Sequence, residues 1–290
     1  MKTVSLSLIP CTVTACLALS CLSSGAQTLI YSDTFPGTAG NLDSAPTTGI
    51  SGLDGGSSGA LPQSAAVEST ISGSGQLDIA TPGGDGSGDN GYIRFDTIGS
   101  SSTLYNWATS PGASATTSAG GMTVSFLWTP ANTTSSDWIY FGAGVDPADS
   151  FGYGYSVPIW SGNSASGIIL ANNGNVATFH GNSSTANSGS FTPSGSTELV
   201  SLTYSFNSWA AGAPVSLTAL VNGQTVISGD SFTWNSAEAG ANYLNLGSYQ
   251  EANTISNFQI STVPEPATWT MLASGFGLLL ASCKSRKNRG

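Results

Sequence analysis

The sequence predicts an all-β fold in which two antiparallel sheets pack face to face. Short runs of alternating apolar and polar residues recur along the 290-residue chain, and Gly, Ser, Asn and Pro separate these runs. A period of two residues is typical of a half-buried strand. Helical spacing of apolar residues is nearly absent between residues 27 and 262. Without helices to cover them, the strands must pack against each other in two layers.

The clearest strands are expected at 123–128, 199–206 and 214–221. In the last of these, Val215, Leu217, Ala219 and Val221 point to one face. The following Asn222-Gly223 tolerates positive φ angles, so a type I′ turn is expected to lead into a strand at 224–227. Further strands are expected at 28–31, 91–95, 138–141, 152–157, 167–170, 175–179, 232–234, 243–246 and 255–260. Long loops are expected at 39–91, with one strand near 76–79, and at 182–196.

The charge distribution excludes several functions. Residues 27–263 contain 15 acidic residues and one basic residue, Arg94, which gives a net charge of −14. Such a body cannot neutralise a phosphate backbone, so no nucleic-acid partner is expected. It holds no Lys for a Schiff base or a phosphate site. His180 is the only His in the chain, which excludes a His-rich metal centre.

The N-terminus is typical of a signal peptide over residues 1–26. Lys2 precedes an uncharged, largely apolar stretch, and Ser24-Gly25-Ala26 resembles a cleavage site, so the mature chain is expected to begin near Gln27. Two alternatives remain open: a retained transmembrane helix, and a lipoprotein signal with Cys16 as the lipidated residue. Residues 27–262 contain no Cys, so no disulfide staples the body.

The C-terminus, residues 263–290, combines three features in a fixed order. Val263-Pro264-Glu265-Pro266 comes first, and an apolar run over 267–283 follows. At about 1.5 Å per residue, this run is just long enough for a helix to cross a thin bilayer. The chain ends in a basic tail that contains Lys284, Arg286, Lys287 and Arg289. These positive charges would hold the tail in the cytoplasm with the body outside.

This order of motif, apolar helix and basic tail resembles the PEP-CTERM sorting signal of exported proteins in Gram-negative bacteria. The resemblance implies export with signal peptidase, transient membrane insertion through the helix, and recognition near Pro264-Glu265-Pro266 by the membrane enzyme exosortase. It also implies a final place at the cell surface or in the extracellular matrix, in association with exopolysaccharide.

The body resembles the concanavalin A-like or laminin-G-like jelly roll in its pattern of strands. The resemblance rests on the opening Tyr31-Ser32-Asp33-Thr34-Phe35, on the hairpin VSLTALVNGQTVISG, and on the later segments YLNLGSYQ and ISNFQI. It implies a single sandwich domain over 27–262 whose last strand returns beside the first.

An acidic segment is the best candidate for an ion site. Asp85, Ser87 and Asp89 fall at positions 1, 3 and 5 of a calcium-type loop, and Asp96 falls at position 12. The Gly comes one residue late, and Asp replaces the usual Glu. A weak Ca²⁺ site is therefore one interpretation, and a solvated acidic turn is the other. Asp146 and Asp149 form a second candidate pair.

Catalytic patterns are weak. A jelly-roll glycosidase needs two carboxylates close together on one strand, and no Glu of the body has another acid two or three residues away. A Ser–His–Asp site would require His180, which follows a predicted strand and is expected to be a surface residue. We therefore expect no enzyme and no catalytic residues.

Aromatic residues offer a second kind of site. Tyr153, Tyr155 and Trp160 belong to an alternating aromatic stretch, and Trp138 and Tyr140 could extend it. Exposed rings would form a platform for sugar rings, whereas buried rings would simply fill the sandwich core. The leading prediction is a non-enzymatic exported matrix or surface protein. The alternatives are a carbohydrate-binding module of the exopolysaccharide matrix and a glycoside hydrolase.

Overall fold

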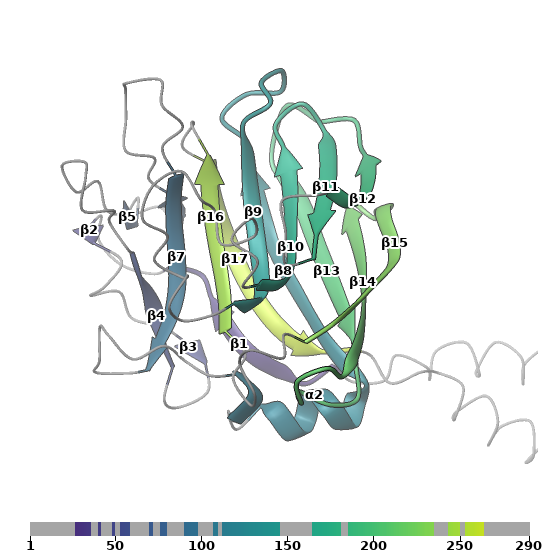
Figure 1. Cartoon of the computed structure of the whole chain (residues 1–290). Helices are drawn as coiled ribbons and strands as arrows, with labels where there is room; N and C mark the ends of the chain where they lie inside the picture. Colours follow the sequence, from purple (N-terminus) through teal and green to yellow (C-terminus); the bar gives the residue numbers. More distant parts are fainter. Residues whose placement is uncertain are drawn as a thin grey trace, which may run out of the picture. The chain divides into compact units, whose positions relative to one another are not determined.

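Alternating apolar and polar residues form antiparallel strands throughout the part of the chain that the structure describes (Figure 1). The structure is a computed structural model. It describes residues 27–35, 40–41, 48–49, 53–58, 70–71, 76–79, 90–97, 107–109, 112–145, 164–180, 185–234, 243–249 and 253–263. All of these except Gln27 belong to one compact unit, Thr28–Val263. The described strands form two sheets, which confirms the predicted antiparallel β-sandwich.

The first sheet has ten strands, and its path runs β15-β14-β13-β8-β17-β6-β5-β2; off this path, β1 pairs with β17, and β3 pairs with β1. These strands are β15 (Gln224–Thr233), β14 (Pro214–Val221), β13 (Glu198–Ser205), β8 (Gly121–Thr129), β17 (Asn253–Thr262), β6 (Leu77–Ile79), β5 (Thr70–Ile71), β2 (Gly40–Asn41), β1 (Leu29–Asp33) and β3 (Thr48–Gly49).

The second sheet has seven strands in the order β12-β11-β10-β9-β16-β7-β4. These are β12 (Thr185–Ser190), β11 (Asn175–Phe179), β10 (Ser164–Ala171), β9 (Trp138–Val145), β16 (Tyr243–Tyr249), β7 (Asn90–Thr97) and β4 (Leu53–Ser58). The side chains that face the first sheet complete the main core. Phe141 of β9 and Tyr204 of β13, for example, meet across it with ring centroids 6.1 Å apart.

The predicted hairpin between β14 and β15 is confirmed. Asn222 and Gly223 have φ angles of 51° and 79°, as a type I′ turn requires. The Asn222 side chain also fixes the neighbouring strand, because its Oδ1 accepts the Leu199 N–H at 2.8 Å. Its Nδ2 donates to the carboxylate of Glu198, which is fully buried. The Ser194 N–H and hydroxyl donate to the same carboxylate at 2.6 and 2.9 Å.

The last strand of the sandwich returns beside the first, as the resemblance implies. In the antiparallel pair of β17 and β1, Ile260 lies opposite Tyr31 and Phe258 opposite Asp33. The Thr262 N–H donates to the Thr28 carbonyl at 2.9 Å. One residue further, the Val263 N–H donates to the Gly121 carbonyl at 3.2 Å. Within the described residues, backbone hydrogen bonding of this sheet thus extends to Val263.

Several expected boundaries are wrong. The segments expected as separate strands at 224–227 and 232–234 belong, except for Trp234, to the single strand β15, which continues through irregular register and through Gly229 at φ 63°. The expected loop at 182–196 contains β12, whose residues are mostly exposed. Pairing with β11 makes it a strand although it lacks an apolar face, because tertiary context overrides local pattern. The expected loop at 39–91 contains β2, β3, β4 and β5 in addition to the expected strand, β6.

Two helical turns also interrupt the expected all-strand pattern. These are η2 (Trp107–Thr109) and α2 (Ala113–Ala119). Helix α2 ends where Gly120 adopts a left-handed conformation with φ 83°. Among the described residues, no helix is long and apolar enough to cross a membrane.

Candidate functional site

Most residues that the sequence singles out lie outside the described part of the chain. This group comprises Asp85, Ser87, Asp89, Asp146, Asp149, Tyr153, Tyr155, Trp160, Pro264, Glu265, Pro266 and the basic tail. For Asp96 only the backbone is described, within β7, and Val263 ends the closing sheet. Within the described ranges, no three His, Cys, Asp or Glu side chains gather in a way that could hold a metal ion.

Trp138 and Tyr140 lie on the outer face of the seven-stranded sheet. Their neighbours on β9, Ile139 and Phe141, point into the main core, so alternation turns Trp138 and Tyr140 away from it. The two rings meet edge to face with centroids 5.7 Å apart. With Ala171, Phe179 and the partly buried Ile169 and Ala177 they form the outer aromatic cluster. Trp138 is 6% exposed and Tyr140 is 1% exposed.

The burial of these two rings confirms one interpretation of the sequence, but they belong to a second, separate core cluster. The rings neither fill the space between the sheets nor form an exposed platform. The Tyr140 ring lies directly over Gly247, its partner on β16, so close that a Cβ atom at Gly247 would be 1.8 Å from Tyr140 Cε1. Glycine is therefore required at this position for the ring to lie flat on the neighbouring strand.

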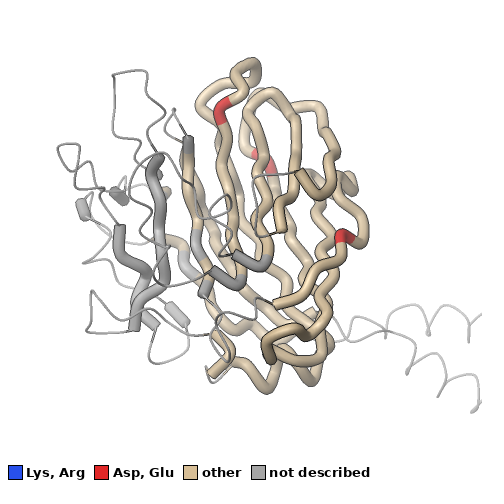
Figure 2. Tube along the Cα trace, viewed as in Figure 1, with Lys and Arg blue, Asp and Glu red and all other residues tan. Residues whose placement is uncertain are grey.

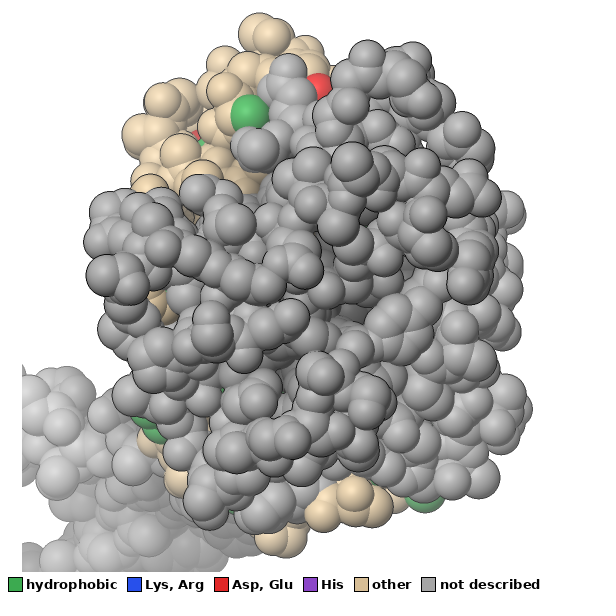
Figure 3. All heavy atoms as spheres, turned by 90° about the vertical axis from the view of Figure 1, so that its left-hand side faces the viewer, with side chains coloured by type: hydrophobic (Ala, Val, Ile, Leu, Met, Phe, Trp, Pro, Cys, Tyr) green, Lys and Arg blue, Asp and Glu red, His purple; other side chains and the backbone are tan. Residues whose placement is uncertain are grey.

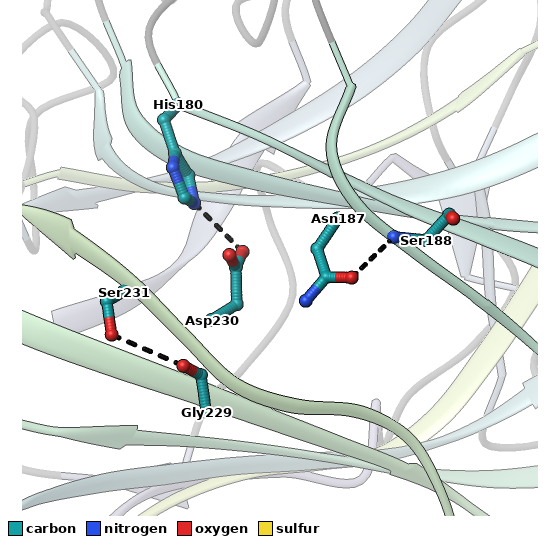
Figure 4. A network of polar contacts seen from close by, with 6 residues as sticks. All are labelled: His180, Asn187, Ser188, Gly229, Asp230 and Ser231. Atoms are coloured by element: carbon teal, nitrogen blue, oxygen red, sulfur yellow. Dashed lines mark hydrogen bonds and ion pairs between the residues drawn. The ribbon is translucent and has the colours of Figure 1, made fainter.

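His180 is not the plain surface residue that the sequence suggests. It follows β11, and its Nε2 lies 2.8 Å from Oδ2 of Asp230 on β15 (Figure 4). The Asp230 side chain is 7% exposed and that of His180 is 25% exposed. The imidazole also lies against Phe232, with ring centroids 5.3 Å apart. Because β11 and β15 belong to different sheets, this pair joins the two sheets at one edge of the sandwich.

The register places two further polar residues at the same level as this pair. On the ten-stranded sheet, Tyr204 lies opposite Leu217, and Leu217 lies opposite Asp230. On the seven-stranded sheet, Ser166 and His180 immediately flank the pair Gly167 and Phe179. We call Ser166, His180, Tyr204 and Asp230 the interior polar layer. Burial raises the pKa of the Tyr204 phenol far above its usual range, Ser166 opposes part of this rise, and the Asp230 carboxylate adds to it.

The interior polar layer is not arranged for nucleophilic catalysis. Ser166 is fully buried, so a substrate has no access to its hydroxyl. The hydrogen bond that His180 makes within the described part of the chain goes to Asp230. The neutral Tyr204, the buried Ser166 and the His180–Asp230 pair instead provide polar contacts between the sheets. Removing one partner of such a pair is costly, because it leaves a buried polar group without its hydrogen bond.

Two of the described carboxylates, those of Glu198 and Asp230, are also too far apart for glycoside hydrolysis. Glu198 begins β13, and Tyr204 lies six residues later at the level of Asp230. At about 3.3 Å per residue, Glu198 and Asp230 are separated by roughly 20 Å along the strand direction. Glycosidases place their two carboxyl groups about 5 to 9.5 Å apart. Glu198 is also fully occupied by Ser194 and Asn222.

The described surface carries no exposed formal charge. The acidic side chains that the structure describes are Asp137, Glu198 and Asp230, and all three are buried (Figure 2). No Lys or Arg side chain is among those described. In the side view of Figure 3, the described atoms at the rim are mostly backbone and uncharged polar groups, with a few hydrophobic atoms and a small part of an acidic side chain. The exposed described surface therefore consists mainly of hydroxyl, amide and small apolar groups, and two leucines, Leu29 and Leu199, are also exposed on it.

Sequence reasoning missed Asp230 and the outer face of β9. Asp230, Phe232 and Trp234 are spaced two residues apart, so they point to the same face of the strand, and Phe232 and Trp234 are buried. This spacing indicates that the Asp230 carboxylate points inward and needs a partner. The sequence offers no comparable signal for the partner, because His180 is 50 residues away. For Trp138 and Tyr140, alternation with Ile139 and Phe141 indicates two opposite faces. It does not indicate which of the faces borders the core.

Comparisons with known proteins do not assign the chain to a family. No protein-family model matches the chain, and no curated protein sequence is similar to it. Solved structures show a partial likeness at low sequence identity. The carbohydrate recognition domain of Emp46p has a TM-score of 0.41 and 12% identity, over 66% of this chain and 83% of that chain. A Bacillus subtilis protein with a galectin-like fold has a TM-score of 0.41 and 10% identity, over 83% and 98%.

The ligand binding domain of botulinum neurotoxin serotype D, solved with N-acetylneuraminic acid, has a TM-score of 0.39 and 12% identity. This likeness covers 86% of the present chain and 51% of the neurotoxin chain, so the chain spans about half the length of that protein. At these values, the likenesses carry no information about a ligand for this chain.

Proposed function

We propose that this chain is a non-enzymatic, exported protein of the cell surface or extracellular matrix, associated with exopolysaccharide. In this proposal, residues 1–26 direct export, and the sandwich, of the concanavalin A-like jelly-roll type, is the exported body. The C-terminal segment is a PEP-CTERM signal that inserts as a helix in transit and is recognised by an exosortase.

One observation carries the proposal. The closing strand β17 ends at Thr262, and the last described backbone hydrogen bond is that of the Val263 N–H to Gly121. No described strand extends past Val263, and Pro264-Glu265-Pro266 follow immediately in the sequence. A cut after Val263 would therefore leave every described strand intact. A removable sorting tail needs a cleavage point of this kind, before which the described sandwich is complete.

The non-enzymatic part of the proposal is supported by two of the three described acids. Glu198 and Asp230 are buried, each accepts hydrogen bonds from structural partners, and roughly 20 Å along the strand direction separates them. Neither is placed to act as an acid or a nucleophile toward a glycosidic bond.

The test of sorting replaces Glu265 by Ala in the native host. We expect the variant to accumulate as uncut precursor in the inner membrane, whereas the wild type reaches the outside with a C-terminus near residues 263–267. Cell fractionation and mass spectrometry of the intact C-terminus measure both. Glu238→Ala, a change of the body, is the matched control and should be exported like the wild type. Unchanged release of Glu265→Ala would contradict a sorting role.

A second candidate function, binding of a neutral carbohydrate, is favoured by the uncharged described surface. The net charge of −14 between residues 27 and 263 repels anionic ligands. Hydroxyl and amide groups without competing charges suit a neutral polyol, because each hydroxyl both donates and accepts hydrogen bonds.

A further inference from the structure

The outer face of the ten-stranded sheet is covered by hydroxyl groups in register. Alternation in β8, β13 and β14 turns most of their apolar residues into the core, and most of the outward residues are Ser and Thr. The residues used below are Thr123, Ser125, Ser201, Thr203, Thr218 and Ser261, and we call them the hydroxyl face. All are half-buried except Thr123, which is 9% exposed.

The register arranges these hydroxyls in rows across neighbouring strands. In one row, Thr218 lies opposite Thr203, Thr203 opposite Thr123, and Thr123 opposite Ser261. In the next row, Ser201 lies opposite Ser125. Neighbouring strands are about 4.8 Å apart and successive outward residues on a strand roughly 7 Å apart. The result is a regular grid of hydroxyl groups on a rigid sheet.

Part of this grid is not used by the protein itself. Thr123 and Thr203 contact each other through Oγ1 atoms 3.4 Å apart, and Thr218 Oγ1 accepts the Gly229 N–H at 3.3 Å. The hydroxyls of Ser125, Ser201 and Ser261 make no hydrogen bond to another group in the described part of the chain. Their donors and acceptors are therefore available to a ligand or to solvent.

A small apolar patch borders the hydroxyl rows. Leu199 of β13 lies opposite Leu127 of β8, and Leu220 of β14 lies opposite Ser201. Leu199 is 48% exposed and is one of the two exposed large apolar side chains among the described residues. A surface that offers hydroxyls next to an apolar patch matches a pyranose ring, which presents hydroxyls at its edge and C–H groups on its faces.

From this we infer that the hydroxyl face and its leucine patch bind a neutral polysaccharide. The inference rests on the second candidate function, binding of a neutral carbohydrate, and it names the surface that would bind. The charge pattern favours a neutral ligand over a polyanion. The hydroxyl face offers no basic group to pair with a polyanion, and the negative charge of the body would repel it. A protein partner would instead favour aromatic or Arg anchors, and the outward residues of β8, β13 and β14 include neither.

The test measures retention of the purified full chain, in a zwitterionic detergent, on insoluble cellulose and on curdlan, with immobilised alginate as the anionic comparison. We expect binding to at least one neutral polymer and none to alginate. Ser201→Arg places a long charged side chain in the middle of the grid and should weaken binding by roughly tenfold or more. Ser125→Ala with Ser201→Ala removes two hydroxyls without adding bulk and should weaken it several-fold.

The matched control is Ser188→Arg, which adds the same group at an exposed position on β12 in the other sheet. It should bind like the wild type. Thermal unfolding of each variant separates loss of the surface from loss of the fold. If Ser201→Arg is folded and binds as tightly as the wild type, the hydroxyl face is not the site, although neutral-glycan binding survives. If the wild type binds neither neutral polymer, the inference fails and the sorting proposal, tested in cells, is untouched.

Discussion

The outer faces of the two sheets are built from the same alternating pattern, yet they differ in chemistry and in exposure. On the seven-stranded sheet, the outward Trp138, Tyr140 and Phe179 are all at most 6% exposed. On the ten-stranded sheet, the outward positions are mostly Ser and Thr, and Leu199 is 48% exposed. Alternation thus assigns a residue to one face of a strand. The residue types then indicate whether that face is covered or meets solvent.

The comparison predicts different energetic roles for the two faces. Residues of the outer aromatic cluster should contribute to stability like core residues, although they lie outside the space between the sheets. Residues of the hydroxyl face should contribute little to stability and should influence binding. The predictions below test this difference, in order of decreasing effect.

The largest effect is expected for Trp138→Ala. The change removes a buried indole that packs edge to face on Tyr140. Truncation of a buried Trp or Phe typically destabilises by about 3 to 5 kcal/mol. Urea unfolding should therefore show a large decrease in the free energy of unfolding. Ser125→Ala on the opposite outer face is the control and should stay within about 0.5 kcal/mol of the wild type. A Trp138→Ala protein as stable as this control would mean that the cluster is not a packing element.

The next effect concerns Gly247, which lies under the Tyr140 ring. Gly247→Ala adds a Cβ that collides with this ring, and overpacking of this kind costs about 1 to 3 kcal/mol. The same change should be much less costly in a Tyr140→Ala background, where the ring is absent. The double-mutant cycle measures this coupling directly. Equal costs of Gly247→Ala in the two backgrounds would show that the ring leaves Gly247 when the extra methyl is present.

Much of the sandwich could be predicted from the sequence because its signals are local. The alternation of Val215, Leu217, Ala219 and Val221 and the Asn222-Gly223 turn both lie within a few residues of each other. Strand β14 and the hairpin were therefore predicted at their observed positions. Strand β12 could not be predicted in this way. Its sequence Thr-Ala-Asn-Ser-Gly-Ser has no apolar face, and only pairing with β11 makes it extended.

The candidate sites depended on non-local information, which is why sequence reasoning located so little of them. The partners His180 and Asp230 are 50 residues apart, and the grid of hydroxyls appears only when β14, β13, β8 and β17 are placed side by side. The order β14-β13-β8-β17 is not the order of the chain. A pattern of Ser and Thr within one strand is typical of any solvated face, and only the register turns it into rows.

The interior polar layer lies between the two sheets. A change in this layer should lower the free energy of unfolding by an intermediate amount. Asp230→Asn keeps the size of the side chain and removes the charge that faces His180. A hydrogen bond to a charged group typically contributes about 1.5 to 3 kcal/mol, so a decrease near the lower end of this range is expected in urea unfolding. Ser231→Ala, an exposed neighbour whose hydroxyl contacts the Gly229 carbonyl, is the control and should change stability little. Equal stabilities of the two variants would show that the pair does not hold the sheets together.

The smallest effect is expected for Thr123→Val combined with Thr203→Val on the hydroxyl face. Valine has nearly the shape of threonine and also favours strands. The two hydroxyls contact each other at 3.4 Å, which is long for a hydrogen bond between hydroxyls, so little should be lost when both partners are removed together. The free energy of unfolding should stay within about 0.5 kcal/mol of the wild type. A decrease of about 1.5 kcal/mol or more would place the hydroxyl rows among the elements that hold the sheet together. In that case the two outer faces would be alike in energetic role and different only in residue type.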